Sequence, residues 1–126
     1  MSKKVVLTAD APQPIGPYSQ GVLINDTLYI SGQVAVDPST GKLITINIIK
    51  ETNQVMHNLM NILKEAGMDF SHVVKTTIYL IDMNNFSHVN EVYGAYFTEG
   101  FPARETVQVT RLPLDVNVEI SMVAVK

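Results

Sequence analysis

The sequence has 126 residues with 46% hydrophobic content, which is enough for one domain with a buried core and too short for two. The net charge of −3 gives no long-range attraction for nucleic acid or anionic lipid, and the absence of cysteine excludes disulfides, a thiolate nucleophile and a cysteine zinc site. No apolar stretch is long enough for a signal peptide or a membrane span. We expect a single domain over residues 1–126, a cytoplasmic location, and neither nucleic acid nor membrane as a partner.

The first third of the chain predicts a short strand, an ordered loop and a β-hairpin. Residues 4–7 form the strand candidate, and three prolines and a glycine within residues 9–20 favour a loop over a helix. Composition alone favours a plain connector, but the position of Tyr18 near the end of this loop is typical of a side chain that borders a pocket. The hairpin covers residues 21–36, and Gly32 within it indicates either a sheet irregularity or a close approach by another group.

Alternation gives the second strand of this hairpin, residues 27–36, one apolar and one semi-polar face. The apolar face is expected to hold Leu28, Ile30, Gly32, Val34 and Val36, and the semi-polar face Thr27, Tyr29, Ser31 and Gln33. Residues 37–41, with their Asp-Pro-Ser-Thr-Gly sequence, predict a turn after the strand.

Apolar residues then recur at helical spacing from residue 48 to residue 66, and Gly67 provides a stop signal. This pattern predicts the first helix. Met56 and Met60 are expected to fill the core rather than to bind a cofactor. The polar face is expected to be solvated and holds Lys50, Glu51, Gln54, His57, Asn58 and Asn61.

The rest of the chain alternates between strand and helix patterns. Residues 73–81 predict a strand, and residues 85–97 predict a second helix that Asp82 or Asn84 could cap. Two final strands are expected over residues 103–109 and 116–125. The whole order predicts a two-layer α+β domain in which the two helices cover one face of the sheet.

The other face of the predicted sheet is expected to lack a covering layer. It should carry Tyr29, Ser31, Lys75, Tyr79, Arg104, Thr106, Asn117, Glu119 and Ser121, mixed with Val123 and Val125. A face with this many aromatic and valine side chains is too apolar to remain open to water. We therefore expect another copy of the chain to cover it in a closed symmetric oligomer, with sites at the seams between subunits.

Two residues near the carboxyl terminus are candidates for chemistry. The chain has only two arginines, Arg104 and Arg111, and the planar fork of Arg104 could bind a carboxylate through two hydrogen bonds. Glu119 interrupts an apolar run and lies on the opposite face of its strand. This spacing fits a catalytic clamp and acid, but on spacing alone a structural salt bridge between adjacent strands is favoured.

The sequence contains no glycine-rich phosphate loop and no Ser-His-Asp pattern. His57, His72 and His88 lack the spacing of metal ligands, and each is expected on or beside a helix surface, in contact with solvent. We therefore expect no metal site.

Six motifs make the chain similar to the RidA (YjgF) family of reactive-intermediate deaminases. The similarity runs nearly end to end. The motifs are Ile-Gly-Pro-Tyr-Ser-Gln at residues 15–20, Ser-Gly-Gln at 31–33, Val-Val-Lys-Thr-Thr at 73–77, Val-Asn-Glu-Val-Tyr at 89–93, Phe-Pro-Ala-Arg at 101–104 and Arg-Leu-Pro at 111–113. The resemblance implies a chorismate-mutase-like fold with a mixed sheet, and a homotrimer whose sheets form a central barrel and whose sites lie between subunits.

The resemblance also implies a function. Members of the family hydrolyse enamines and imines such as 2-aminoacrylate, 2-iminopropanoate and 2-iminobutanoate to 2-keto acids and ammonia, without a metal or organic cofactor. Arg104 matches the residue that clamps the substrate carboxylate, and Glu119 matches the acid that activates water. The resemblance further assigns Tyr18, Ser31, Gly32, Asn90 and Thr106 to substrate binding.

The chain departs from the family pattern beside the clamp. Where the family commonly has Arg-Ser-Cys, this chain has Arg104, Glu105 and Thr106, with the Glu105 side chain expected to point away from Arg104. Ser121 replaces a common acidic residue. Two alternatives to the deaminase therefore stay open: a non-enzymatic trimer that binds small carboxylates as a metabolic regulator, and a ribonuclease, which the acidic charge balance disfavours.

Overall fold

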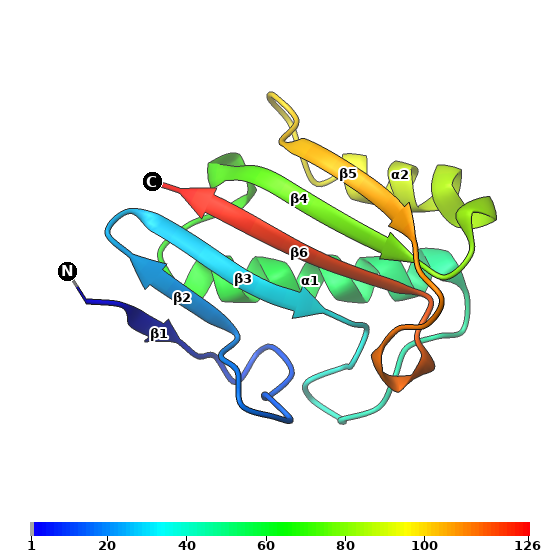
Figure 1. Cartoon of the computed structure of the whole chain (residues 1–126), viewed down its shortest axis with the longest axis horizontal. Helices are drawn as coiled ribbons and strands as arrows, with labels where there is room; N and C mark the ends of the chain where they lie inside the picture. The colour runs from blue at the N-terminus through cyan, green and yellow to red at the C-terminus, as the bar shows by residue number, and fades with distance from the viewer. Residues whose placement is uncertain (1) are drawn as a thin grey trace.

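The computed structural model describes residues 2–126, which form a six-stranded sheet and two α-helices (Figure 1). The strands lie in the order β1-β2-β3-β6-β4-β5, and every neighbouring pair is antiparallel except β4 and β5, which are parallel. The strands are β1 (Lys4–Val6), β2 (Gly21–Ile24), β3 (Thr27–Gln33), β4 (Val73–Leu80), β5 (Ala103–Gln108) and β6 (Val118–Val125), and the helices are α1 (Ile48–Glu65) and α2 (Phe86–Gly94).

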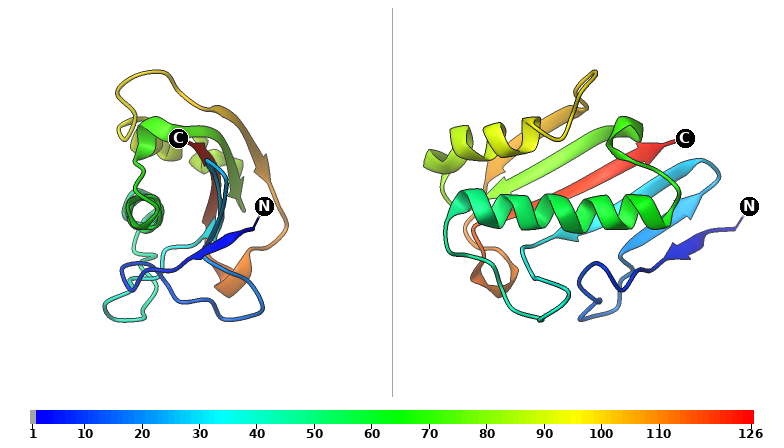
Figure 2. Two further views of the ribbon diagram at one scale, coloured as in Figure 1. Left: turned by 90° about the vertical axis from the view of Figure 1, so that its left-hand side faces the viewer. Right: turned by 180° about the vertical axis from the view of Figure 1, so that it is seen from behind.

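Both helices pack on the same face of the curved sheet, so the molecule has two layers (Figure 2). The opposite face, called here the open face, has no covering layer among residues 2–126. The predicted mixed α+β architecture is therefore confirmed. The predicted ends differ by a few residues, most at β3, which ends at Gln33, and at α2, which ends at Gly94.

Helix α1 supplies most of the core on the covered face. Asn47 begins the helix because its side chain accepts a hydrogen bond from the backbone N–H of Lys50, and Gly67 follows its end with a φ of 73°. Met56 is buried with the apolar stripe of the helix, whereas Met60 is exposed, so the expectation that both methionines fill the core was wrong for Met60. The buried stripe is Val55, Met56, Leu59, Ile62 and Leu63.

The polar face of α1 is not fully solvated, because Glu51 and Asn58 are completely buried. The Asn58 amide donates hydrogen bonds to the carbonyl oxygens of Val34 and Val36, at 3.1 and 3.0 Å. The Glu51 carboxyl accepts 2.7 Å hydrogen bonds from the backbone N–H and the side-chain amide of Asn117. The expectation of a solvated face was wrong here because helical spacing cannot reveal polar partners more than twenty residues away.

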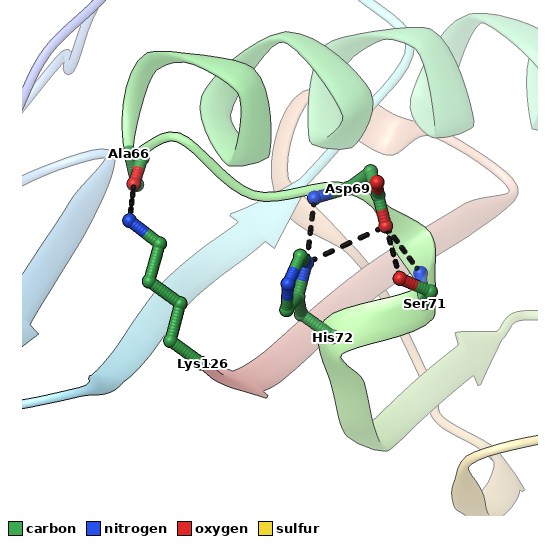
Figure 3. Close-up of polar contacts among 5 residues, drawn as sticks. All are labelled: Ala66, Asp69, Ser71, His72 and Lys126. Atoms are coloured by element: carbon green, nitrogen blue, oxygen red, sulfur yellow. Dashed lines mark hydrogen bonds and ion pairs between the residues drawn. The ribbon is translucent and has the colours of Figure 1, made fainter.

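The turn after α1 directs the chain into β4 through a compact set of polar contacts (Figure 3). The Asp69 carboxylate accepts hydrogen bonds from the hydroxyl and the backbone N–H of Ser71, which hold the pKa of Asp69 below its ordinary value. His72 Nδ1 accepts from the Asp69 backbone N–H at 3.0 Å, and Lys126 Nζ donates to the Ala66 carbonyl oxygen at 3.4 Å. The carboxyl end of the chain is thereby attached to the carboxyl end of α1.

Strand β3 carries an irregularity that changes which side chains face the core. Its register with β6 shifts between Ile30 and Gln33, which is the signature of a β-bulge. After the shift Gln33 is buried, while Gly32 and Val34 line a cavity with Glu119. Ser31 keeps its predicted face, but the predicted faces were wrong from Gly32 onward, because one extra residue in a strand reverses the alternation that follows.

The loop before β2 is ordered by one buried side chain, Gln20. Its amide nitrogen donates to the carbonyl oxygens of Thr8 and Pro12 at 3.0 and 2.9 Å, and its amide oxygen accepts from the Thr8 backbone N–H at 2.7 Å. The predicted ordered loop is thus confirmed, and it places Tyr18 beside the bulge of β3.

The contact between Glu51 and Asn117 fixes the start of β6, and we expect its loss to destabilise the fold. Replacing the buried Glu51 by alanine leaves two donors of the partly buried Asn117 without these acceptors, which should lower the free energy of unfolding by about 2–4 kcal/mol. Urea unfolding measures this, with Glu65→Ala on the exposed end of the same helix as the control. An equal, small effect of both variants would contradict a structural role for Glu51.

Candidate functional site

Arg104 lies on β5 with its guanidinium held against two aromatic rings of α2. It pairs with Thr76 of β4, on the helix-covered face. Its Cζ lies 5.2 Å from the centroid of the Tyr93 ring and 5.7 Å from that of Phe86, distances typical of cation–π contacts. Among residues 2–126 no carboxylate forms an ion pair with Arg104. The donors of the guanidinium are thus available to an anion.

A cavity of about 310 Å³ opens beside this guanidinium, and we call it the arginine cavity. It is lined by Asn90, Tyr93, Gly94, Phe101, Pro102 and Arg104. Tyr93 is fixed in its wall because its hydroxyl donates a 2.9 Å hydrogen bond to the Thr76 hydroxyl, and burial raises its pKa above the ordinary value. The arrangement offers a positive charge on a rigid aromatic support, with the Asn90 amide as a second polar group.

Thr106 follows Arg104 at the next position on the same face of β5. Its hydroxyl oxygen is buried and has no hydrogen-bond partner among residues 2–126. A buried hydroxyl without a partner carries a cost in free energy, so such a group is suited to bind a ligand or a water molecule.

Glu119 lies on β6 opposite Tyr79, on the open face, in a second cavity of about 360 Å³ that we call the acid cavity. The side chain is about half buried, and its carboxyl has no hydrogen bond or ion pair to another residue of the described chain. Burial raises the pKa of this carboxyl above its ordinary value. The cavity is lined by Ile15, Tyr18, Ser31, Gly32, Val34, Pro113, Leu114 and Glu119.

Two contacts explain how the bulge and the loop shape the acid cavity. A Cβ placed on Gly32 would overlap the carboxyl of Glu119, so both alternatives for this glycine hold: a sheet irregularity and a close approach. The Ser31 hydroxyl donates a 2.6 Å hydrogen bond to the carbonyl oxygen of Ser19, which attaches the loop to β3. The Tyr18 hydroxyl accepts a 3.3 Å bond from the backbone N–H of Ile15.

The seven residues predicted from the sequence therefore divide between two faces of the sheet. Tyr18, Ser31, Gly32 and Glu119 meet in the acid cavity, Asn90 and Arg104 meet in the arginine cavity, and Thr106 lies on the face of Arg104. The expectation that Arg104 and Thr106 share the open face with Glu119 was wrong. The salt bridge between Arg104 and Glu119 that spacing alone favoured does not form.

The pairing of β5 with β4 explains this separation. Because Arg104 pairs with Thr76 and Thr106 with Ile78, both follow the buried alternation of β4. Glu105 points away from Arg104, as expected, and because Arg104 is on the covered face this places Glu105 on the open one, where its carboxylate contacts Lys75 Nζ at 2.6 Å and the Thr77 hydroxyl at 2.5 Å. These contacts lower the pKa of Glu105 and keep its charge away from Arg104.

Sequence reasoning missed the aromatic support of Arg104. Phe86 and Tyr93 were assigned only to the apolar side of α2, and their seven-residue spacing on a helix was the available signal, because it puts two rings on one face. Within residues 2–126 no group of three His, Cys, Asp or Glu side chains could hold a metal ion, and no helix is long and apolar enough to cross a membrane.

The raised pKa of Glu119 predicts a dependence of stability on pH. Burial penalises the charged carboxylate, so this side chain favours folding most below the ordinary glutamate pKa of 4.5 and loses that contribution as pH rises through the folded-state value. Glu119→Gln should therefore melt at a slightly higher temperature than the natural chain at pH 7, and the difference should vanish near pH 4. A lower melting temperature at pH 7 would show that the carboxylate stabilises the fold.

Comparisons with known proteins place the chain in a family. Residues 8–126 match the family model described as Endoribonuclease L-PSP. The human 2-iminobutanoate/2-iminopropanoate deaminase is 49% identical over 124 residues, which cover 98% of this chain and 90% of the human protein. A structure of the conserved Rid protein family from Yersinia pestis is 44% identical, with a TM-score of 0.97 over 99% of this chain and 100% of that one.

A third relative adds a ligand. The structure of Escherichia coli TdcF with bound serine is 36% identical to this chain, with a TM-score of 0.94 over 98% of each chain. The match of the family model to residues 8–126, and identities of this size over nearly the whole length, confirm the resemblance stated from the motifs. The chain belongs to the Endoribonuclease L-PSP family.

Proposed function

We propose that this chain hydrolyses reactive enamines and imines of small 2-keto acids, releasing the keto acid and ammonia. The observation that carries the proposal is the pair of unpartnered charged groups, the Arg104 fork and the Glu119 carboxyl with its raised pKa. Such groups in cavities are typical of sites that bind and transform small ions. The human relative, named a 2-iminobutanoate/2-iminopropanoate deaminase, supports the same reaction class.

The chemistry follows from these two groups. Arg104 binds the substrate carboxylate and orients the molecule. An enamine such as 2-aminoacrylate first takes a proton on its terminal carbon and loses one from its nitrogen, which gives the imine. Glu119 accepts a proton from a water molecule as the water oxygen bonds to the imine carbon, and the imine nitrogen takes a proton from solvent to become an amine. Glu119 then returns its proton to that nitrogen, the carbon–nitrogen bond breaks, and the hydroxyl group gives its proton to solvent as the keto group forms.

The products are a 2-keto acid and ammonia, and the cycle leaves Glu119 as it began. No cofactor is needed in this scheme, because the imine carbon is already electrophilic. The raised pKa of Glu119 suits both steps, since an acid whose pKa lies nearer to neutral pH exchanges protons more readily in each direction.

We assign the remaining predicted residues to positioning. Tyr18 closes the acid cavity, Ser31 and Gly32 form its wall, and Asn90 lies at the rim of the arginine cavity. The unpartnered hydroxyl of Thr106 would hydrogen-bond to substrate or water. A neighbour described with bound serine makes a small carboxylate of this size a reasonable ligand here.

We further propose that each site is shared between two copies of the chain in a homotrimer, whose open faces form a central barrel. One copy would contribute the arginine cavity and its neighbour the acid cavity. Two observations support this arrangement: the two cavities lie on opposite faces of one sheet, and the open face exposes large apolar side chains. These side chains include Val5, Tyr29, Val107 and Val125.

The reaction is tested by the release of pyruvate from 2-aminoacrylate, generated in place by a serine dehydratase, with semicarbazide as a competing trap. The natural chain should accelerate release, and Arg104→Ala should reduce the acceleration by about a hundredfold or more because the substrate loses its anchor. Lys50→Ala, which removes an exposed positive charge on α1, is the matched control.

Size-exclusion chromatography of Arg104→Ala checks that the assembly is intact. Binding of pyruvate by the natural chain without any acceleration would favour the carboxylate-binding regulator over the enzyme. Full activity of Arg104→Ala would show that Arg104 is not needed to bind the substrate carboxylate.

The assembly is tested on the open face itself. Tyr29 lies at the centre of this face, opposite Val22 and Val123 on the neighbouring strands. Tyr29→Asp places a charge that would be buried without a partner, and we expect the mass measured by light scattering to fall from three chains to one. Met60→Asp, on the exposed side of α1, should leave the mass unchanged. A trimer for Tyr29→Asp would mean that another surface holds the copies together.

A further inference from the structure

A third cavity of about 360 Å³ adjoins the acid cavity and has a lining dominated by apolar residues. Its walls include Ala11, Pro12, Val36 and Pro38. Ile15 and Leu114 line both cavities and therefore lie at the boundary between them. Cavities of about 300–1,000 Å³ hold ligands of drug size. The combined space is larger than a three-carbon imino acid needs.

Ile15 and Leu114 are large apolar side chains that a single copy of the chain leaves exposed at the mouth of the acid cavity. Ile15 is 77% exposed and Leu114 is 51% exposed. They come from different loops, one before β2 and one before β6, yet line the same two cavities. Single exposed apolar residues need no explanation, but two that converge beside a candidate acid offer an apolar surface to a ligand.

The backbone of Leu114 is held in an unfavourable conformation. Its φ is 59°, and that of Asp115 is 56°, in the left-handed region that β-carbon crowding disfavours. The Arg111 guanidinium fixes this turn, with Nε 2.7 Å and Nη2 3.3 Å from the two carboxylate oxygens of Asp115. Glycine or asparagine would adopt this conformation more easily, so the leucine side chain is held there at a cost.

We propose that Ile15 and Leu114 form a subsite for the side chain of the substrate, so that imines with branched or aromatic side chains react faster than three-carbon ones. The inference rests on the proposed function and deepens it. With its carboxylate on Arg104 and its imine carbon at Glu119, a longer substrate extends along these two residues into the third cavity. Burial of the additional carbons then stabilises the bound substrate.

The test compares imines generated in place from leucine, phenylalanine and alanine by an L-amino-acid oxidase, with semicarbazide as the trap. The natural chain should show a kcat/KM for the leucine-derived imine at least about tenfold above that for the alanine-derived one. Leu114→Asn keeps a residue that tolerates the left-handed conformation but lacks the apolar side chain, and should bring this ratio close to one. Ile15→Ser should lower the ratio as well.

Ile46→Ser provides the matched control, since Ile46 is 76% exposed, close to the 77% of Ile15, but lines neither cavity. This variant should keep the ratio of the natural chain. A ratio that is close to one in the natural chain, or that Leu114→Asn and Ile15→Ser leave unchanged, would overturn the subsite while leaving the deaminase activity in place.

Calorimetry separates failure of the subsite from failure of the reaction. 4-Methyl-2-oxopentanoate should bind the natural chain more tightly than pyruvate, and Leu114→Asn should remove the difference. If no imine is hydrolysed but this binding preference is found, the proposed reaction fails and the subsite stands. If imines are hydrolysed and the two keto acids bind equally, the subsite fails and the reaction stands.

Discussion

Successive side chains of a β-strand point to opposite faces of the sheet, and this constraint separates the two charged groups that matter most in this chain. Arg104 follows the buried alternation of β4 and faces the helices, whereas Glu119 faces away from them. No rotation of side chains brings the two together within one sheet. We therefore propose that two copies of the chain supply the two groups to one reaction. On this account the open apolar face and the divided site are two consequences of one arrangement of strands.

Each half of the site holds an ionisable group without a partner of opposite charge. Neighbouring side chains surround each group in place of such a partner. Aromatic rings support Arg104 in place of a carboxylate, and burial without a partner raises the pKa of Glu119. The carboxylate next to Arg104 in the sequence, that of Glu105, forms an ion pair with Lys75 and not with Arg104. Free charges and a strained turn at Leu114 are the kinds of local cost that proteins retain at functional sites.

The order of elements, the two layers and the open face could all be predicted from the sequence, because apolar periodicity reports which side of a helix or strand is buried. Which residues of β3 and β5 face the helices could not be predicted in the same way. The bulge in β3 moved Gly32 and Val34 to the open face, and the pairing of β5 moved Arg104 to the covered one. Both depend on contacts with strands distant in sequence. The same limit applies to Glu51, whose partner Asn117 is 66 positions away.

If one copy supplies Arg104 and another supplies Glu119 to a single site, mixed oligomers test this arrangement most directly. Arg104→Ala and Glu119→Gln chains, each inactive alone, would be co-expressed with different tags and purified through both. A shared site should restore about a third of the natural activity, since one of the three seams in each mixed trimer that carries both tags unites an intact Arg104 with an intact Glu119. Mixed oligomers with no activity would contradict the shared site and require both residues to act within one chain.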